Sequence, residues 1–174
     1  MIDRTRTLGL PFALALILSL QPAPLSAEEA CAARPLALTF SKDFLNARLM
    51  LSRMVIDVAS RSQPFQMATI SAQREGRAQE IMPQVQSRLE ATVDRHVAQW
   101  ACNLALAYQD HYTDEEMQSM LDKPETSPHL PKLQQTGEAV GETMRELSSP
   151  ILGAAATELS NGMWAEFGKK KETE

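Results

Sequence analysis

The chain has 174 residues with a formal net charge of −5, and 44% of them are hydrophobic but only 5% aromatic. An acidic chain argues against nucleic-acid binding, in which Lys and Arg neutralise phosphates, and against broad docking on anionic lipid. With so few aromatic residues, the core must be mainly aliphatic and methionine side chains, which favours helices packed on helices in a single domain.

The N-terminus has the pattern of an export signal. Two arginines precede an almost purely apolar run over 8–20, which is followed by two prolines and the small residue Ala27. This pattern predicts a signal peptide at residues 1–27, cleaved after Ala27, and a periplasmic or secreted protein. An uncleaved anchor is the alternative, but a membrane span needs roughly 20 apolar residues. Cleavage removes two arginines and one aspartate and takes the net charge from −5 to −6, leaving no transmembrane anchor.

Only two cysteines are present, Cys31 and Cys102. In an oxidising compartment such a pair usually forms a disulfide, and closing this long loop is worth about 4 kcal/mol. Free thiols, a metal pair or a redox couple are the alternatives, although a redox couple generally requires Cys-x-x-Cys. We predict a structural disulfide.

The first half of the chain predicts two long helices after an irregular lead-in at residues 28–40. Ser41 is placed to cap a helix that runs from Lys42 to about residue 62. Residues 64–78 are ambiguous and could include a short helix. From about Glu80 to residue 108, apolar residues recur every three or four positions, as on one face of a helix. Pro83 is tolerated only in a first turn, which predicts a start near Glu80 or the next residue.

The stretch from 108 to 117 predicts a tight corner between two helices. Thr113 and Glu116 have the spacing of a capping box, in which each side chain bonds a free backbone N–H of the other residue. Tyr112 and Met117 are spaced to form a hydrophobic staple around the same helix start. We therefore expect a short helix over 114–122, followed by a loop at 125–131.

The C-terminal part predicts two further helices and a charged tail. The first runs over 131–147 and contains Gly137 and Gly141, which permit the close approach of a neighbour at some cost in helix propensity. Ser149 and Pro150 resemble a cap and a first helical position, so a separate last helix should end at residue 168, before a tail at 169–174. No segment alternates like a strand. The prediction is an all-α, single-domain bundle of five to six helices over 41–168.

No catalytic constellation is visible in the sequence. His111 lies among acidic residues that include Asp110, and such a group could bind a metal or act as a general base. No second histidine has ligand spacing, and acids at a helix start favour the helix dipole. Motifs for serine nucleophiles, phosphate loops and dinucleotides are absent. We therefore predict no enzyme activity, metal or cofactor, and keep Asp110 and His111 as candidates to probe.

The corner also carries a family resemblance. Members of a bacterial family known as domain of unknown function 2059 pair a long helix ending in Tyr with a Phe/Tyr-Thr-x-Glu-Glu corner, a short helix and a Ser-Pro-x-Gly-x-Lys segment. The chain resembles this family over about 85–145, although Leu130 replaces the motif glycine. The resemblance implies an exported helical bundle with no established activity and no catalytic residue. The matching residues are Tyr108, Tyr112, Thr113, Glu115, Glu116, Ser127, Pro128 and Lys132.

Three functions are compatible with these features. The leading hypothesis is a non-enzymatic module that binds an envelope protein, a peptide or a small apolar ligand. Its eight methionines after Met1 could line an adaptable groove, although methionine more often fills cores. The alternatives are an envelope hydrolase with a site near His111 and a structural homo-oligomer. An apolar groove supports the first, further acids or imidazoles around His111 support the second, and a flat two-fold apolar patch supports the third.

Overall fold

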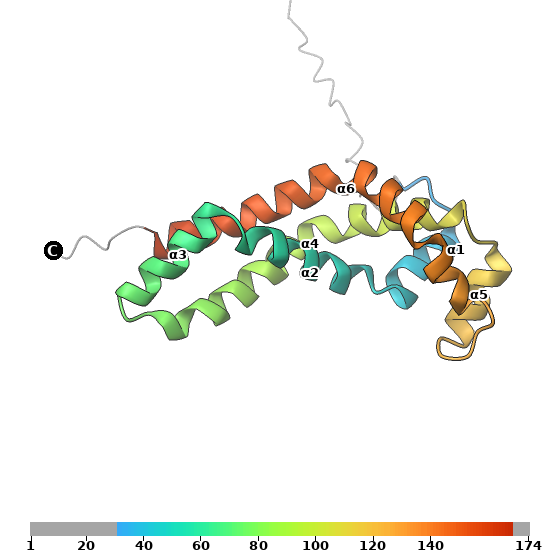
Figure 1. Cartoon of the computed structure of the whole chain (residues 1–174), viewed down its shortest axis with the longest axis horizontal. Coiled ribbons are helices and arrows are strands. Elements are labelled where there is room, and N and C mark those ends of the chain that lie inside the picture. The colour runs from blue at the N-terminus through green and yellow to red at the C-terminus, as the bar shows by residue number, and fades with distance from the viewer. Residues whose placement is uncertain (1–30, 169–174) are drawn as a thin grey trace, which may run out of the picture.

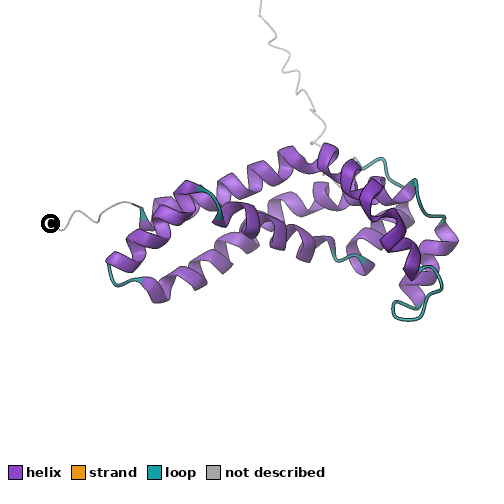
Figure 2. Cartoon of the chain, in the orientation of Figure 1, coloured by secondary structure: helices purple, strands orange, loops and turns teal. Residues whose placement is uncertain are grey.

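The computed structural model describes residues 31–168, and within this range the chain is helical without a β-strand (Figure 2). The predicted all-α bundle is confirmed. The predicted signal peptide at 1–27 and the tail at 169–174 lie outside the described residues. No helix in the described range is long and apolar enough to cross a membrane. The elements are α1 (Pro35–Thr39), the π-helix η1 (Phe40–Phe44), α2 (Ala47–Ser60), α3 (Gln63–Arg74), α4 (Ala78–Gln109), α5 (Asp114–Asp122) and α6 (Leu130–Phe167).

The two longest helices, α4 and α6, run antiparallel along the long axis of the bundle (Figure 1). Arg88 near the start of α4 pairs with Glu166 near the end of α6 at 3.3 Å. Asn103 farther along α4 donates to the Ser148 hydroxyl at 3.0 Å. Helix α3 lies at one end of the bundle, and α5 with its following loop lies at the other. The predicted corner is thus at the end of the molecule opposite α3.

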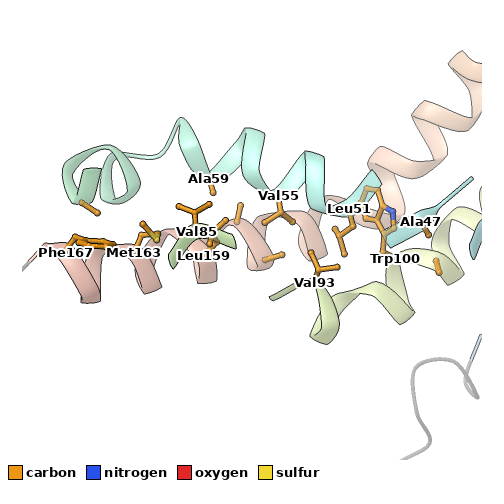
Figure 3. Close-up of a cluster of buried hydrophobic side chains, with 14 of the residues drawn as sticks. Ala47, Leu51, Val55, Ala59, Val85, Val93, Trp100, Leu159, Met163 and Phe167 are labelled. Carbon is orange, nitrogen blue, oxygen red and sulfur yellow. The ribbon is translucent and has the colours of Figure 1, made fainter. Parts of the chain in front are cut away.

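The main core lies where α2, α3, α4 and α6 meet. Buried residues recur every four positions on α2 and on the second half of α6, so each helix presents one apolar stripe to the others. Trp100 on α4 is the largest buried side chain and inserts at one end of this core (Figure 3). Aliphatic and methionine side chains form most of the remainder, in line with the low aromatic content. The labelled members are Ala47, Leu51, Val55, Ala59, Val85, Val93, Trp100, Leu159, Met163 and Phe167.

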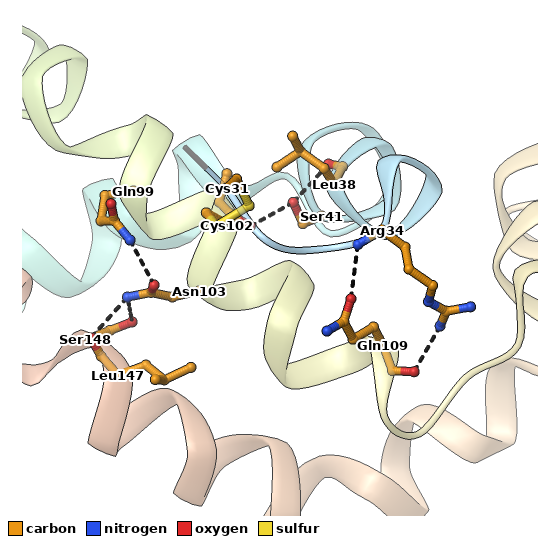
Figure 4. Close-up of a disulfide and its surroundings, with 11 residues drawn as sticks. Cys31, Arg34, Leu38, Ser41, Gln99, Cys102, Asn103, Gln109, Leu147 and Ser148 are labelled. Carbon is orange, nitrogen blue, oxygen red and sulfur yellow. Dashed lines mark hydrogen bonds between the residues drawn. A yellow bond between two sulfur atoms is a disulfide. The ribbon is translucent and has the colours of Figure 1, made fainter. Parts of the chain in front are cut away.

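The predicted disulfide is confirmed. The sulfur atoms of Cys31 and Cys102 are 2.07 Å apart, and the bond joins the segment before α1 to the second half of α4 (Figure 4). No free cysteine occurs among the described residues. The bond therefore ties the start of the described chain to a buried position on α4.

The prediction of an irregular lead-in at residues 28–40 is wrong for its second half. Residues 35–39 form α1, and η1 follows directly. Phe40 is fully buried and packs against Phe44, Tyr108 and Tyr112, with ring centroids 4.8, 5.8 and 6.2 Å away. This aromatic contact and the disulfide hold the segment on α4, which a local sequence pattern cannot reveal.

The predicted cap at Ser41 is also wrong. Ser41 is fully buried, and its hydroxyl donates to the backbone oxygens of Leu38 at 2.8 Å and Ala101 at 3.0 Å. Asn46 caps α2 instead, because its side chain accepts a bond from Leu49 N at 3.1 Å. Asn46 has a φ of 52°, a left-handed conformation that asparagine tolerates better than most residues.

The predicted break at Ser149–Pro150 does not occur, since α6 is continuous from 130 to 167. Proline removes the hydrogen bond to the carbonyl four residues earlier, here that of Glu146. Glu146 and Pro150 are both exposed, so water can reach the Glu146 carbonyl. On the buried side, Asn103 donates to the Leu147 carbonyl at 2.9 Å. Packing on both sides of the proline therefore outweighs the local signal to start a new helix.

The ambiguous stretch at 64–78 is mostly helix α3. Ser62 caps it, accepting from Phe65 N at 3.4 Å. Helix α4 then begins at Ala78, a little before the predicted start, which places Pro83 in the second turn. The carbonyl that loses its bond is that of Gln79, which is exposed to solvent.

Candidate functional site

The predicted corner forms as a capping box with a staple. The Thr113 hydroxyl accepts from Glu116 N at 3.3 Å, and the Glu116 carboxylate accepts from Thr113 N at 3.0 Å. Tyr112 and Met117 are 3% and 0% exposed and belong to one buried cluster. Both local predictions are confirmed, and they position α5 relative to α4.

A lysine from the next helix completes this corner. Lys132 donates to both carboxylate oxygens of Glu116, at 2.7 and 2.8 Å, and its Nζ lies 4.7 Å from the centroid of the Tyr112 ring. The Tyr108 and Tyr112 rings are 5.7 Å apart. The lysine and the backbone N–H of Thr113 lower the pKa of Glu116 below its ordinary value. We call Tyr108, Tyr112, Thr113, Glu116 and Lys132 the corner cluster.

The other motif residues lie around the cluster without joining it. Ser127 is 4% exposed; its hydroxyl hydrogen-bonds that of Ser119 at 3.0 Å and accepts from His129 N at 3.3 Å, which shapes the loop before α6. Glu115 and Pro128 are exposed. The pKa of Glu115 is lowered by its own backbone N–H and by the Thr113 hydroxyl, as expected at a helix start. The contacts of the other motif residues therefore join α4, α5 and α6 and give these residues a structural role.

A substitution at Lys132 tests this structural role. Lys132→Met keeps an unbranched side chain but removes the ion pair and the cation–π contact, so we expect the free energy of unfolding at pH 7 to fall by about 1 kcal/mol. Because the pKa of Glu116 is lowered in the folded state, the pair stabilises above the ordinary value of 4.5 and this contribution is lost as the pH falls. The difference from wild type should therefore shrink in acid. Lys123→Met, at an exposed lysine that ends α5, is the control for urea unfolding. Equal losses for the two variants would contradict this role.

The candidate site near His111 is a shallow polar depression of about 480 Å³. The polar contacts in this depression are made mainly by Arg34. Its guanidinium donates to the backbone oxygens of Gln109 at 2.7 Å and Tyr112 at 2.6 Å, and it forms an ion pair with Asp114. The side chains of His111 and Asp110 line the depression. Within residues 31–168 neither makes a hydrogen bond or ion pair, and no three His, Cys, Asp or Glu side chains come together as a metal site. The structure thus brings no further acid or imidazole onto His111.

A second concavity is apolar and lies between α2, α4 and α6. Its volume is about 370 Å³, and it is a groove half enclosed by the three helices. Asn103 does not line this groove, but its side chain donates to the Ser148 hydroxyl and the Leu147 carbonyl and so holds α4 against α6 beside it. We call it the apolar groove. Its lining residues are Met50, Met54, Trp100, Leu104, Tyr108, Gly137, Val140, Gly141, Met144, Arg145, Ser148, Ser149 and Leu152.

Two kinds of residue keep the groove open and adaptable. Gly137 and Gly141 are exposed on α6, and a Cβ built on either meets nothing within 4 Å. The predicted close neighbour is therefore not supplied by residues 31–168. Met50, Met54 and Met144 line the walls with flexible, polarizable side chains that adapt to irregular shapes, whereas Met117, Met120 and Met163 are fully buried in the core.

Sequence reasoning found parts of these sites but not their assembly. Arg34 lies in the lead-in that was expected to be irregular, and only the fold brings it 2.6 Å from the Tyr112 carbonyl. Trp100 belongs to the apolar stripe predicted over 80–108, and that pattern gives no sign that this residue also borders a groove. Both roles depend on residues far away in the sequence. Arg34 bonds Tyr112, which is 78 residues later, and Trp100 lines the groove together with Met50 and Met144 from two other helices. A methionine-lined groove was raised as a possibility, and the methionines and the two glycines of α6 were the available signals.

Comparison of the chain with protein-family models, curated proteins and solved structures finds no match. The resemblance carried by the corner motif therefore stays a prediction. Two candidate functional sites in the described chain are the polar depression at His111 and the apolar groove.

Proposed function

We propose that this chain is an exported, non-enzymatic helical protein that binds a small apolar molecule in the apolar groove. The groove carries this proposal. Its volume of about 370 Å³ lies within the roughly 300–1,000 Å³ of small-molecule sites, which are mostly apolar with a few polar groups. The disulfide supports an exported, periplasmic or secreted location, because disulfides persist in oxidising compartments. Membership of the family that the corner resembles is part of the same proposal.

The groove favours binding over hydrolysis as the function. A hydrolytic site needs a base or nucleophile held by partners in a concave site, and the His111 imidazole has no such partner within residues 31–168. The hydrolase hypothesis therefore ranks below binding. A structural homo-oligomer also ranks lower, because a groove between three helices suits a guest better than the flat patch a two-fold interface would present.

A helical peptide from an envelope protein is the second candidate for the same groove. Gly137 and Gly141 lie one turn apart on an exposed face of α6 with open space above them. Such a pair lets a partner helix approach the backbone closely, and an amphipathic helix in an apolar groove is a common recognition mode. Competition between a small apolar probe and added peptide distinguishes the two candidates.

Filling the groove should abolish binding without harming the fold. Gly141→Leu places a side chain in open space inside the groove and improves helix propensity by up to about 1 kcal/mol. We expect its affinity for the neutral apolar probe N-phenyl-1-naphthylamine to fall by about tenfold or more, since overfilling costs about 1–3 kcal/mol. Probe fluorescence measures binding, and circular dichroism checks the fold.

Gly153→Leu is the matched control for this experiment. Gly153 is on the same helix, is exposed and also has open space at its Cβ, but it does not line the groove. The control should bind the probe like wild type. If Gly141→Leu binds as tightly as Gly153→Leu, the groove is not the binding site and the proposed function fails.

A further inference from the structure

Two donors of residues that line the groove have no acceptor in the described part of the chain: the Trp100 N–H, which is buried behind the wall, and the Tyr108 hydroxyl. Trp100 is 2% exposed, and its indole N–H is buried with no hydrogen-bond partner within the described chain. Buried Trp N–H groups usually find a partner, and leaving one unpaired is costly. The hydroxyl of Tyr108 makes no hydrogen bond within residues 31–168, and burial raises its pKa, so it stays a donor at neutral pH. The Trp100 N–H has almost no accessible surface, so the Tyr108 hydroxyl is the uncharged donor that a ligand in the groove can reach.

A positive charge decides which kind of acceptor fits. Arg145 is the one charged residue among those that line the groove in the described chain. It is exposed, and its guanidinium forms no ion pair within residues 31–168, although the chain as a whole is acidic with a net charge of −5. The nearby Ser149 hydroxyl is already used, because it donates to the Arg145 carbonyl. An unpaired arginine that lines the same groove as the unpaired Tyr108 hydroxyl favours an anionic oxygen ligand.

The other residues that line the groove indicate the chemistry of the uncharged part of the ligand. Apart from the donors and two serines, the walls are aliphatic, methionine and glycine residues, which offer an alkyl chain contacts without hydrogen bonds. A volume of about 370 Å³ suits one chain rather than two. A single arginine in an acidic protein matches one negative charge, as on a carboxylate, better than the roughly two of a phosphate monoester.

We infer that the groove binds a single-chain fatty acid, with its carboxylate at Arg145 and its alkyl chain along Met50, Leu104 and Met144. This inference rests on the proposed function and adds the chemical class of the ligand. Arg145 lies about halfway along the α6 wall, between Gly137 and Leu152. The alkyl chain therefore has apolar surface available on either side of the carboxylate.

The test compares saturated fatty acids of 8 to 16 carbons (a span of about 8 methylenes) with the matched alcohols, each below its micelle concentration. Titrations follow the fluorescence of Trp100 in a Trp164→Phe background. Affinity for the acids should rise by up to about fourfold per methylene until the chain outgrows the groove. Each acid should bind about two- to fivefold more tightly than its alcohol, and added salt should reduce this preference.

Arg145→Gln should remove the preference for acids while leaving the affinity for alcohols unchanged. Arg53→Gln, at an exposed arginine of α2 outside the groove, is the control and should keep the preference. If acids and alcohols bind equally in wild type, or if Arg145→Gln keeps the preference, the carboxylate inference is overturned and the apolar-ligand function stands. If neither the ligands nor N-phenyl-1-naphthylamine bind, both proposals fail. The fatty-acid inference is also overturned if the affinity does not depend on alkyl-chain length and only a helical peptide displaces the bound acid.

Discussion

Replacing Cys31 and Cys102 together with alanine is expected to lower the free energy of unfolding by about 4 kcal/mol. The disulfide closes a loop with a sequence separation of 71 residues. In the chain-entropy model a crosslink of this length removes about 4 kcal/mol of freedom from the unfolded chain. A single domain of this size typically has only 5–15 kcal/mol of stability in total. The disulfide is therefore a large share of what keeps the protein folded.

The folded state itself should change little when the disulfide is lost. Arg34 still bonds the Gln109 and Tyr112 carbonyls, and Ser41 still bonds Ala101, so the N-terminal segment keeps other contacts with α4. The double variant should therefore have the helical content of wild type by circular dichroism but a lower urea midpoint. Reduced wild-type protein should match the variant, which serves as an internal control.

Thiol labelling provides the decisive check on the disulfide. Wild-type protein, denatured without reductant, should contain no reactive thiol, and two labelled cysteines would contradict the pairing. If the pairing holds but the double variant loses less than about 1 kcal/mol, the entropic account of this crosslink is wrong for this protein.

The features predicted correctly from the sequence are those encoded within a few residues. Thr113 and Glu116 are three positions apart, and a capping box needs only those two side chains and the intervening backbone. The single pair of cysteines likewise left one possible disulfide. The spacing of Thr113 and Glu116 is enough to predict the cap, and the number of cysteines is enough to predict the disulfide.

The failures occur where packing between distant segments decides the structure. Ser149 and Pro150 form a good local start signal, yet α6 continues because Ser148 on one side and Ala155 on the other are buried against neighbouring helices. Lys132 was identified from the motif, but its contact with Glu116 depends on the path of the intervening loop. Hydrophobic periodicity shows which face of a helix is buried and not which other helix covers it.

The same limit explains why the position of the groove could not be predicted. Met50, Leu104 and Met144 come from three helices, and each fits an ordinary apolar stripe in its own helix. A groove forms where the apolar stripes of neighbouring helices do not contact each other, so it depends on how the helices pack. Gly137 and Gly141 were the nearest local signal, because glycines inside a helix cost stability and need a reason.

Phe40→Ala is expected to be among the most destabilising single substitutions, with a loss of about 3–5 kcal/mol. The side chain is fully buried and lies between Phe44 of its own element and the two tyrosines of the corner cluster. Its removal leaves a cavity and takes away aromatic contacts from Tyr108 and Tyr112. Urea unfolding monitored by circular dichroism measures the loss.

Two matched substitutions separate burial from aromatic contact at this position. Leu49→Ala, at a side chain that is 43% exposed on the neighbouring helix, should cost less than about 1 kcal/mol. Phe40→Leu keeps most of the apolar volume and should cost less than Phe40→Ala, with the remaining difference from wild type reporting the aromatic contacts. If Phe40→Ala costs no more than Leu49→Ala, residues 35–40 belong to a loosely attached lead-in, as the sequence suggested. A large loss instead makes Phe40 the residue through which the N-terminal segment stabilises the corner, because its ring contacts both corner tyrosines, Tyr108 and Tyr112.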